Sequence, residues 1–317
     1  MRIHVQNGRN DGVFAVTAAM FGDSGHQLSF GTTEAEFTAA MMEAEALVTS
    51  GSLAKTLFPC DAPKLRLVFC TSAGLEKLAP YDWLPPGCEL LNNSGVHALR
   101  GGEYCTMAIL MLAAQMPAMI ASQHAQIWQK QFAPPLRGRR LGVLGTGDLG
   151  AAAARQARHF GMVVTGIRTR DEPHLDFDRT VTQERIDEVL PGLEFLIIAA
   201  PLTKATEGMI SRTRLESLPQ GAFVINIGRG AIIDQDAICD LLDSGHLGGA
   251  VLDVFVPEPI PAGHRLWTTR NLVITPHCSV DDPSSYAADS VRVFLDNVDA
   301  FTEGRPMPNR FDTIRGY

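Results

Sequence analysis

Residues 141–150 read LGVLGTGDLG, a short apolar run that leads into the pattern G-x-G-x-x-G. The apolar run is typical of a buried strand, and the Ala-rich stretch 151–160 indicates a helix. Between a strand and a helix this glycine pattern has a physical meaning. Gly145 permits a tight turn, Gly147 lets the backbone approach a pyrophosphate, and Gly150 allows the helix to pack closely on the strand. We therefore predict a dinucleotide site at the N-terminus of this helix.

Further apolar runs follow at spacings that leave room for helices between them. These runs lie at 162–167, 195–199, 222–226, 249–253 and 272–275. Such alternation predicts a doubly wound parallel sheet. The carboxyl ends of its strands converge on a single crevice, so separate segments of the chain can build one site there.

A second set of apolar runs precedes the glycine pattern, at 2–6, 27–30, 46–49, 65–70 and 89–92. Between them a capping box, Thr33 with Glu36, opens a helix at 34–44. A last helix is expected at 284–301, with a polar tail that packs back on the first domain. The chain of 317 residues thus predicts two Rossmann-like α/β domains. The substrate (catalytic) domain is discontinuous, 1–97 with 282–317, and the dinucleotide-binding domain is 98–281.

The charge balance argues against nucleic acid as a partner. Asp and Glu number 35 against 27 Lys and Arg, which gives a net charge of −8 that repels a phosphate backbone. The basic cluster at 137–140 is interpreted as a solvated loop between domains. Residues 1–10 have no apolar core of a signal peptide, so we expect a cytoplasmic protein. The apolar segment 104–121 contains Gln115 and Pro117 and is predicted to be a buried core or subunit-interface helix rather than a membrane span.

The six cysteines show no C-x-x-C spacing. Reduced thiols fit this pattern better than disulfides or zinc, and no metal site is predicted. Cys278 adjoins His277 and is interpreted as a small packing residue rather than a reactive thiolate.

Three segments that follow apolar runs each supply one ionisable group. NIGRG at 226–230 carries Arg229, DVFVPEP at 253–259 carries Glu258, and TPH at 275–277 carries His277. Hydride addition to a ketone leaves negative charge on oxygen, which an arginine stabilises and an imidazolium quenches by giving a proton. Taken singly, His277 is also compatible with a capped core histidine and Glu258 with a plain loop charge. The three together, beside a dinucleotide motif, favour a nicotinamide-dependent dehydrogenase.

The second strand of the dinucleotide domain ends in Arg168-Thr169-Arg170. An acidic residue usually meets the free ribose 2′-hydroxyl of NAD at this point. Two guanidinium groups match a 2′-phosphate instead, so we predict that NADPH is preferred, with NADH as the alternative cofactor. Two other interpretations remain open: both arginines are solvated loop residues, or Asp171 serves the hydroxyl.

These motifs resemble the D-isomer-specific 2-hydroxyacid dehydrogenase family, most closely its glyoxylate/hydroxypyruvate reductase branch. The resemblance is strong over 138–280, including Pro201-Leu202-Thr203. It is weaker over 65–112, including Thr71-Ser72-Ala73-Gly74 and Gly102-Glu103, and little beyond the strand pattern is recognisable before residue 45.

The resemblance implies residue roles. Arg229 binds the substrate carboxylate and polarises the C2 carbonyl, His277 is the general acid, and Glu258 hydrogen-bonds its imidazole. The turn Ser72-Ala73-Gly74 resembles the loop whose amides hold the substrate carboxylate. Trp128 stands where related reductases reach into a partner's active site, although ordinary interface packing explains it equally well. The implied cofactor contacts are Gly145, Gly147, Asp148, Leu149, Gly150, Arg168, Thr169, Arg170, Ala200, Pro201, Ile227, Gly228, Asp253 (to the nicotinamide carboxamide), His277 and Ser279.

Two positions depart from the family pattern. Asp148 puts negative charge near a pyrophosphate, and we expect its side chain to turn to solvent or to cap the helix. The basic segment 168–170 replaces the acidic residue of the NAD-using members.

The leading hypothesis is therefore a reductase of a small 2-ketoacid, such as glyoxylate or hydroxypyruvate, that forms the D-2-hydroxyacid. A homodimer is expected through the 104–130 region, whose apolar side chains would otherwise stay exposed. The enzyme alternatives are an NAD-linked dehydrogenase of larger 2-hydroxyacids, or of another small anion such as phosphite or formate. Formate oxidation needs no proton donor, and Glu258 argues against it. The non-enzyme alternative is a cofactor-sensing protein that resembles the corepressors built on this fold.

Overall fold

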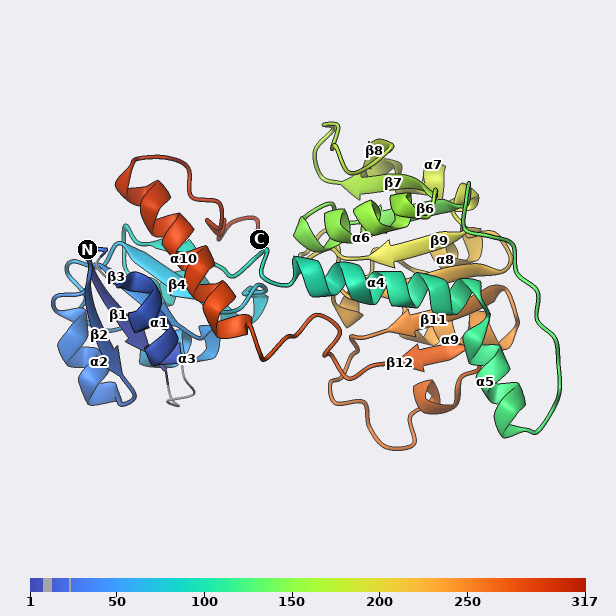
Figure 1. The fold of residues 1–317 in the computed structure, drawn as a ribbon, viewed down its shortest axis with the longest axis horizontal. Helices are drawn as coiled ribbons and strands as arrows, with labels where there is room; N and C mark the ends of the chain where they lie inside the picture. Colours follow the sequence, from blue (N-terminus) through green and yellow to red (C-terminus); the bar gives the residue numbers. More distant parts are fainter. Residues whose placement is uncertain (8–12, 23) are drawn as a thin grey trace. The chain divides into compact units, whose positions relative to one another are not determined.

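The computed structural model describes residues 1–7, 13–22 and 24–317. Residues 8–12 and 23 lie outside this description, and they include the end of the N-terminal stretch considered above. The chain divides into two α/β units (Figure 1), each with one all-parallel sheet. Unit 1 is Met1–Val96 with Asp282–Tyr317, and unit 2 is His97–Asp281. The predicted fold class, two parallel-sheet α/β domains, is confirmed.

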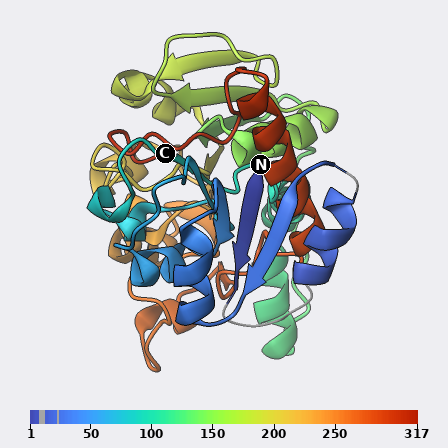
Figure 2. The same cartoon turned by 90° about the vertical axis from the view of Figure 1, so that its left-hand side faces the viewer.

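The sheet of unit 1 has the strand order β2-β1-β3-β4-β5. Its strands are β1 (Arg2–Gln6), β2 (Gln27–Gly31), β3 (Ala46–Thr49), β4 (Leu67–Cys70) and β5 (Glu89–Leu91). Two helices, α1 (Val13–Phe21) and α10 (Tyr286–Thr302), pack together on one face (Figure 2). The other face is covered by α2 (Glu34–Met41) and α3 (Gly51–Leu57), and the short helical turns are η1 (Glu76–Leu78) and η2 (Tyr81–Trp83).

The predicted capping box at the start of α2 is confirmed. The Thr33 hydroxyl accepts from the Glu36 amide at 3.3 Å, and the Glu36 carboxylate accepts from the Thr33 amide at 3.0 Å. Amide donors from Thr32 and Thr33 lower the pKa of Glu36 to about 2. The helix ends at Met41, three residues before the predicted end at 44.

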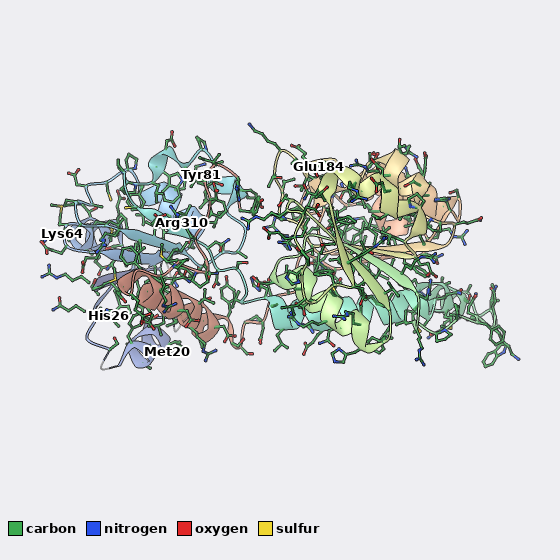
Figure 3. The ribbon with its side chains drawn as sticks, turned by 90° about the horizontal axis from the view of Figure 1, so that it is seen from above. Met20, His26, Lys64, Tyr81, Glu184 and Arg310 are labelled. Atoms are coloured by element: carbon green, nitrogen blue, oxygen red, sulfur yellow. The ribbon has the colours of Figure 1, made fainter. Side chains whose placement is uncertain are left out.

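The C-terminal segment packs beside β5 of unit 1. Arg310 Nε donates to Glu89 at 2.7 Å, and the Phe311 amide donates to the Leu90 carbonyl at 2.8 Å. The Phe311 ring also packs edge-on against Tyr81, with centroids 5.5 Å apart. Tyr81 and Arg310 are labelled in Figure 3. These contacts, with those of α10, complete unit 1 from the far end of the sequence.

The sheet of unit 2 has the strand order β12-β11-β10-β9-β6-β7-β8. Its strands are β6 (Arg140–Leu144), β7 (Val163–Arg168), β8 (Arg179–Thr182), β9 (Phe195–Ile198), β10 (Ala222–Asn226), β11 (Leu247–Leu252) and β12 (Leu272–Ile274). Strand β8 was not predicted from the sequence, because this edge strand has only four residues and buries only Val181. The strand order reverses between β6 and β9, which is where a doubly wound sheet opens a ligand crevice.

Helices cover both faces of this sheet. On one face α4 (Ala98–Ala113) packs against α6 (Asp148–His159), and Gly102 brings the two backbones together over Ala152. The other face carries α7 (Ile186–Val189), α8 (Arg212–Ser217) and α9 (Gln235–Asp243). The remaining elements are α5 (Met116–His124), η3 (Gln183–Arg185), η4 (Leu190–Gly192), η5 (Gly230–Ile232) and η6 (Arg265–Thr268).

The single helix predicted across 104–121 is wrong. The chain breaks at Gln115, whose φ is 55°, and α5 starts anew with Pro117 in its first turn. Proline has no N–H to continue the hydrogen bonds of α4, so the axis bends by 62°. One face of α4 is buried, whereas α5 has no buried residue. Among the described residues no single helix is long and apolar enough to cross a membrane, although α4 and α5 taken together pass by length and composition.

The interpretation of 137–140 as a solvated loop is wrong for Arg139. Its side chain is only 13% exposed and pairs with Glu194 at 3.0 Å. The guanidinium carbon lies 4.6 Å from the ring centroid of Phe195 and 5.5 Å from that of Phe223. A planar guanidinium stacks on aromatic faces, so this arginine is part of the packing at the amino ends of β9 and β10.

The turn between β6 and α6 depends on the absence of side chains at two of its glycines. Gly145 has a φ of 93°, and a Cβ there would lie 2.7 Å from the Ala200 backbone. A Cβ at Gly150 would lie 1.9 Å from the Gly145 carbonyl oxygen. A Cβ at Gly147, by contrast, would meet no atom within 4 Å. Gly145 and Gly150 are therefore required by the fold itself, whereas Gly147 leaves room for something outside it.

We expect Gly150→Ala to destabilise the protein and Gly147→Ala to leave it nearly unchanged. The added methyl at position 150 must displace backbone, which costs about 1–3 kcal/mol at overpacked sites. At position 147 the cost is that of a weaker helix cap, below about 1 kcal/mol. Urea unfolding of the cofactor-free protein measures both values. Equal losses in the two variants would contradict this account of the turn.

Candidate active site

Three loops at neighbouring strand ends carry the ionisable groups singled out from the sequence. Arg229 follows β10, Glu258 lies in the loop after β11, and His277 follows β12. These strands are adjacent in the parallel sheet of unit 2, so their carboxyl ends lie along one edge. The fold thereby brings the three segments to a common edge.

His277 and Glu258 form a direct hydrogen bond. Nδ1 of the imidazole lies 2.8 Å from Oε2 of the carboxylate. The other oxygen, Oε1, accepts from the Phe255 amide at 2.8 Å, so both carboxylate oxygens are engaged. The side chains are 45% and 32% exposed, which rules out a buried core histidine. Because a carboxylate only accepts, Nδ1 carries a proton, and Nε2 is the nitrogen that can exchange one with a ligand.

The loop that carries Glu258 is tied to the start of α9 by Gln235. The Gln235 amide group donates to the Val256 carbonyl at 2.8 Å and accepts from the Val256 amide at 3.1 Å. This paired contact fixes the backbone two residues before Glu258. No motif in the sequence pointed to Gln235, because it lies 21 residues from its partner.

The loop that carries Arg229 is held by the buried side chain of Asn226. Asn226 donates to the Arg229 carbonyl at 3.1 Å and accepts from the Gly228 amide at 3.0 Å. Arg229 itself is half-buried, and its Nη1 donates to the Gly228 carbonyl at 2.8 Å. A Cβ at Gly230 would lie 2.4 Å from the backbone of Phe255. The arginine loop and the glutamate loop therefore touch backbone to backbone.

Asp253 organises the loop of His277. Its carboxylate is 1% exposed and accepts from the hydroxyls of Thr275 at 2.5 Å and Ser279 at 2.6 Å. It also accepts from the amides of Cys278 and Ser279 at 3.1 and 3.2 Å. The contacts implied by the family resemblance, from Asp253 and Ser279 to the cofactor, stay predictions.

Cys278 is not the packing residue that the sequence suggested, because it is exposed. Loss of some solvent around the thiol raises its pKa, and the negative charges of Asp253 and Asp281 raise it further. A raised pKa disfavours the thiolate, so the rejection of a reactive thiolate agrees with its surroundings.

The dinucleotide side of the sheet edge is built from the ends of β6, β7, β9 and β10. Ala200 and Pro201 follow β9, Ile227 and Gly228 follow β10, and a Cβ at Gly228 would lie 2.8 Å from the Ala200 carbonyl oxygen. Gly147, where a Cβ would meet no atom within 4 Å, is the N-cap of α6, and backbone amides in the first turn of a helix attract anions. Asp148 is exposed, in accord with the expectation that it turns to solvent.

Arg168 differs from the other residues of its basic segment. Its side chain is 18% exposed, its Nη1 donates to the Glu172 carbonyl at 3.1 Å, and its Nη2 lies 4.0 Å from the Glu172 carboxylate. Thr169 and Arg170 are exposed. The interpretation of Arg168 as a fully solvated loop residue is therefore wrong.

The predicted substrate turn Ser72-Ala73-Gly74 follows β4 in unit 1. The Ser72 carbonyl accepts from the Asn93 amide at 3.1 Å, and the Ala73 carbonyl accepts from Asn92 Nδ2 at 2.9 Å. These contacts fix the turn from the end of β5 and leave it half-buried. Trp128 lies in unit 2 after α5, and its side chain is 93% exposed.

Comparisons with known proteins found a matching family model and several relatives. Residues 106–279, more than half of the chain, match the model of the D-isomer specific 2-hydroxyacid dehydrogenase NAD binding domain. A putative 2-hydroxyacid dehydrogenase of Haemophilus influenzae is 31% identical over 296 residues, which cover 86% of this chain and 90% of the relative. Glyoxylate/hydroxypyruvate reductase B of Yersinia pestis is 30% identical over 249 residues, 76% of each chain.

The fold is shared with solved structures. The crystal structure of an NADPH-dependent glyoxylate/hydroxypyruvate reductase from Sinorhizobium meliloti, in complex with NADP and sulfate, matches with a TM-score of 0.80 at 25% identity. The match covers 100% of this chain and 99% of that chain. With the family model and the relatives, it leads to one conclusion: this chain is an NAD(P)-dependent oxidoreductase that belongs to the D-isomer-specific 2-hydroxyacid dehydrogenase family.

Proposed function

We propose that this protein reduces a small 2-ketoacid of the glyoxylate/hydroxypyruvate type to the D-2-hydroxyacid, with NADPH as the preferred cofactor. The family acts on small 2-hydroxyacids and 2-ketoacids, and relatives named for glyoxylate and hydroxypyruvate support the choice of substrate. The observation that carries the proposal is the 2.8 Å bond between His277 and Glu258 on the sheet edge that also presents Arg229. In this proposal 98–281 is the dinucleotide-binding domain, and 1–97 with 282–317 is the substrate domain.

The cofactor fits the residues present at the strand ends. Gly147 leaves the turn open, the α6 amides can donate to a pyrophosphate, and Arg168 with Arg170 matches a ribose phosphate. When bound, the nicotinamide supplies the hydride. The other residues proposed to hold it are Gly145, Asp148, Leu149, Gly150, Thr169, Ala200, Pro201, Ile227, Gly228, Asp253, His277 and Ser279.

The chain's own side chains then stabilise charge and transfer the proton. The planar fork of Arg229 binds the substrate carboxylate and polarises the C2 carbonyl, a task for which a point charge is a poor substitute. Glu258 orients the imidazole, so that Nε2 of His277 gives its proton to the C2 oxygen as negative charge develops there. In the proposed site the amides of Ser72, Ala73 and Gly74 hold the carboxylate, and Trp128 of a second subunit closes the site.

We expect His277→Gln to lower ketoacid reduction by about 10²–10⁴-fold, the usual contribution of general acid catalysis. NADPH oxidation, followed by absorbance with glyoxylate and hydroxypyruvate, measures the rate. Cofactor affinity, measured by fluorescence, stays nearly constant because the change removes no charge from the phosphate side. His159→Gln, at the exposed end of α6, is the matched control and retains full activity.

The same assay tests the proposed function as a whole. A wild-type protein that binds NADPH but reduces neither ketoacid contradicts it. Near wild-type turnover in His277→Gln, under conditions where chemistry limits the rate, contradicts the assignment of the proton donor.

We expect NADPH to be preferred over NADH by about 30- to 1000-fold, because two charge-assisted contacts to a phosphate contribute roughly 2–4 kcal/mol. Arg168→Asp then weakens NADPH use by repulsion and leaves NADH use comparatively unharmed. The preference also shrinks as salt rises, since the contact between the phosphate and the exposed Arg170 is screened. The ratio of kcat/KM values for the two cofactors is the measurement.

Arg270→Asp is the matched control, because it makes the same charge change at the amino end of β12. A wild type that favours NADH, or an Arg168→Asp variant with an unchanged ratio, shows that the ribose is recognised by Asp171 or by the backbone instead.

We also propose a homodimer built on the 104–130 region. Several large apolar side chains are exposed there: Met107, Leu110, Met116, Ile120, Ile127 and Trp128. A second copy of the chain would cover them. Light scattering at micromolar concentration should return about twice the 34.3 kDa chain mass, and Ile120→Asp should shift it toward the monomer. A monomeric mass for the wild type contradicts the proposal.

A further inference from the structure

A chain of three side chains runs from helix α4 to the loop of His277. The Tyr104 hydroxyl lies 2.7 Å from Oγ1 of Thr275, and this Oγ1 donates to the Asp253 carboxylate at 2.5 Å. A threonine hydroxyl has one proton, and that proton goes to the carboxylate. Tyr104 must therefore donate to Thr275. The two hydrogen bonds therefore run in one direction: the tyrosine donates to the threonine, and the threonine donates to the aspartate.

These hydrogen bonds involve residues on both sides of His277. Thr275 precedes the histidine by two residues, while Cys278 and Ser279, which follow it, donate to the same Asp253 carboxylate. The His277 amide donates to the Asp253 carbonyl at 2.9 Å. The backbone of His277 has a φ of 50°, a left-handed conformation that is unfavourable for a residue with a side chain. The surrounding hydrogen bonds hold it there.

We propose that Tyr104 and Thr275 are positioning residues for the proton donor. Through Asp253 they fix the backbone of the His277 loop, so that the imidazole meets Glu258 with Nδ1 and keeps Nε2 for the substrate. The proposal rests on the proposed function, in which His277 transfers the proton.

The surroundings of Tyr104 support this role. Its ring is buried on the face of α4 that packs on the sheet, so the hydroxyl projects from a rigid element. Burial raises the pKa of Tyr104 to about 12, which keeps the hydroxyl protonated as a donor under working conditions. A site is held more accurately by a packed helix than by loop contacts alone.

The test removes single hydroxyl groups and measures the hydride-transfer rate in single turnovers. Thr275→Val should lower this rate about 10- to 100-fold, the usual effect of removing a group that orients a catalytic residue. Thr275→Ser keeps the hydroxyl and should remain within about threefold of the wild type. Tyr104→Phe should cost about 3- to 10-fold, because one neutral hydrogen bond is lost. The KM for the ketoacid and the Kd for NADPH should change far less than the rate.

Thr269→Val is the matched control. Thr269 is also buried, and its hydroxyl donates to the Arg265 carbonyl at 3.0 Å, outside the loops of the site. It should lose comparable thermal stability without losing rate. The double variant of Tyr104 and Thr275 should be no slower than Thr275→Val alone, because the tyrosine acts through the threonine.

A second readout needs neither cofactor nor turnover. In protein labelled with ¹⁵N-histidine, the ring shifts of His277, assigned by comparison with His277→Gln, report which nitrogen carries the proton. The wild type should show the Nδ1–H form that the bond to Glu258 requires, and Thr275→Val should show a mixture of both tautomers.

Three results would overturn the proposal. The first is a Thr275→Val variant that loses stability but keeps its rate and its Nδ1–H signature, which indicates a purely structural hydroxyl. The second is a rise in the NADPH Kd as large as the fall in rate, which would mean that these hydrogen bonds position the cofactor and not His277. The third is that Thr275→Val lowers the rate by the same factor in the His277→Gln background, where no proton donor is left to position. A wild type that reduces no ketoacid refutes the proposed function instead, and the tautomer measurement still tests the positioning role.

Discussion

The candidate site depends on the hydrogen bonds that the buried carboxylate of Asp253 accepts. A charged group that is removed from water must be surrounded by donors, and here all four of its donor groups come from the segment 275–279. The need to satisfy this carboxylate therefore folds the segment around it. His277 lies within that segment, so the placement of the imidazole follows from the solvation of a different side chain. Asp253, which follows β11, is linked through Thr275 to Tyr104 on α4, and Tyr104 anchors the network to the packed interior.

The sequence predicted those features that depend on local pattern. Long apolar runs predicted every central strand. The segments that follow these runs predicted Arg229, Glu258 and His277, because parallel strands end on one edge. It failed where the decisive contact is distant or conformational. The break at Gln115 needs a left-handed residue that is not glycine, and Arg139 is buried by rings from two other strands. Tyr104 and Thr275 are 171 residues apart, and no spacing rule connects them.

The basic segment 168–170, at the end of β7, makes contacts that its composition does not reveal. Arg168 already contacts the carbonyl and the carboxylate of Glu172, so a phosphate must exchange with a partner from the same turn. This loop is itself held by Thr180 of β8, whose hydroxyl donates to the Glu172 carbonyl at 3.0 Å. The edge strand that was missed in the sequence thus fixes the shape of the segment proposed to recognise the ribose.

The contact between Gly230 and the backbone of Phe255 has a consequence for how such a site can diversify. The loop of Arg229 cannot shift toward the Glu258 loop without displacing it, and Glu258 in turn holds His277. A larger substrate cannot be accommodated by relaxing one of these loops, because all three would lose their alignment together. Mutations that broaden the substrate range are therefore confined to positions outside this interlocked edge. The chemistry can be inherited unchanged while the rest of the pocket varies.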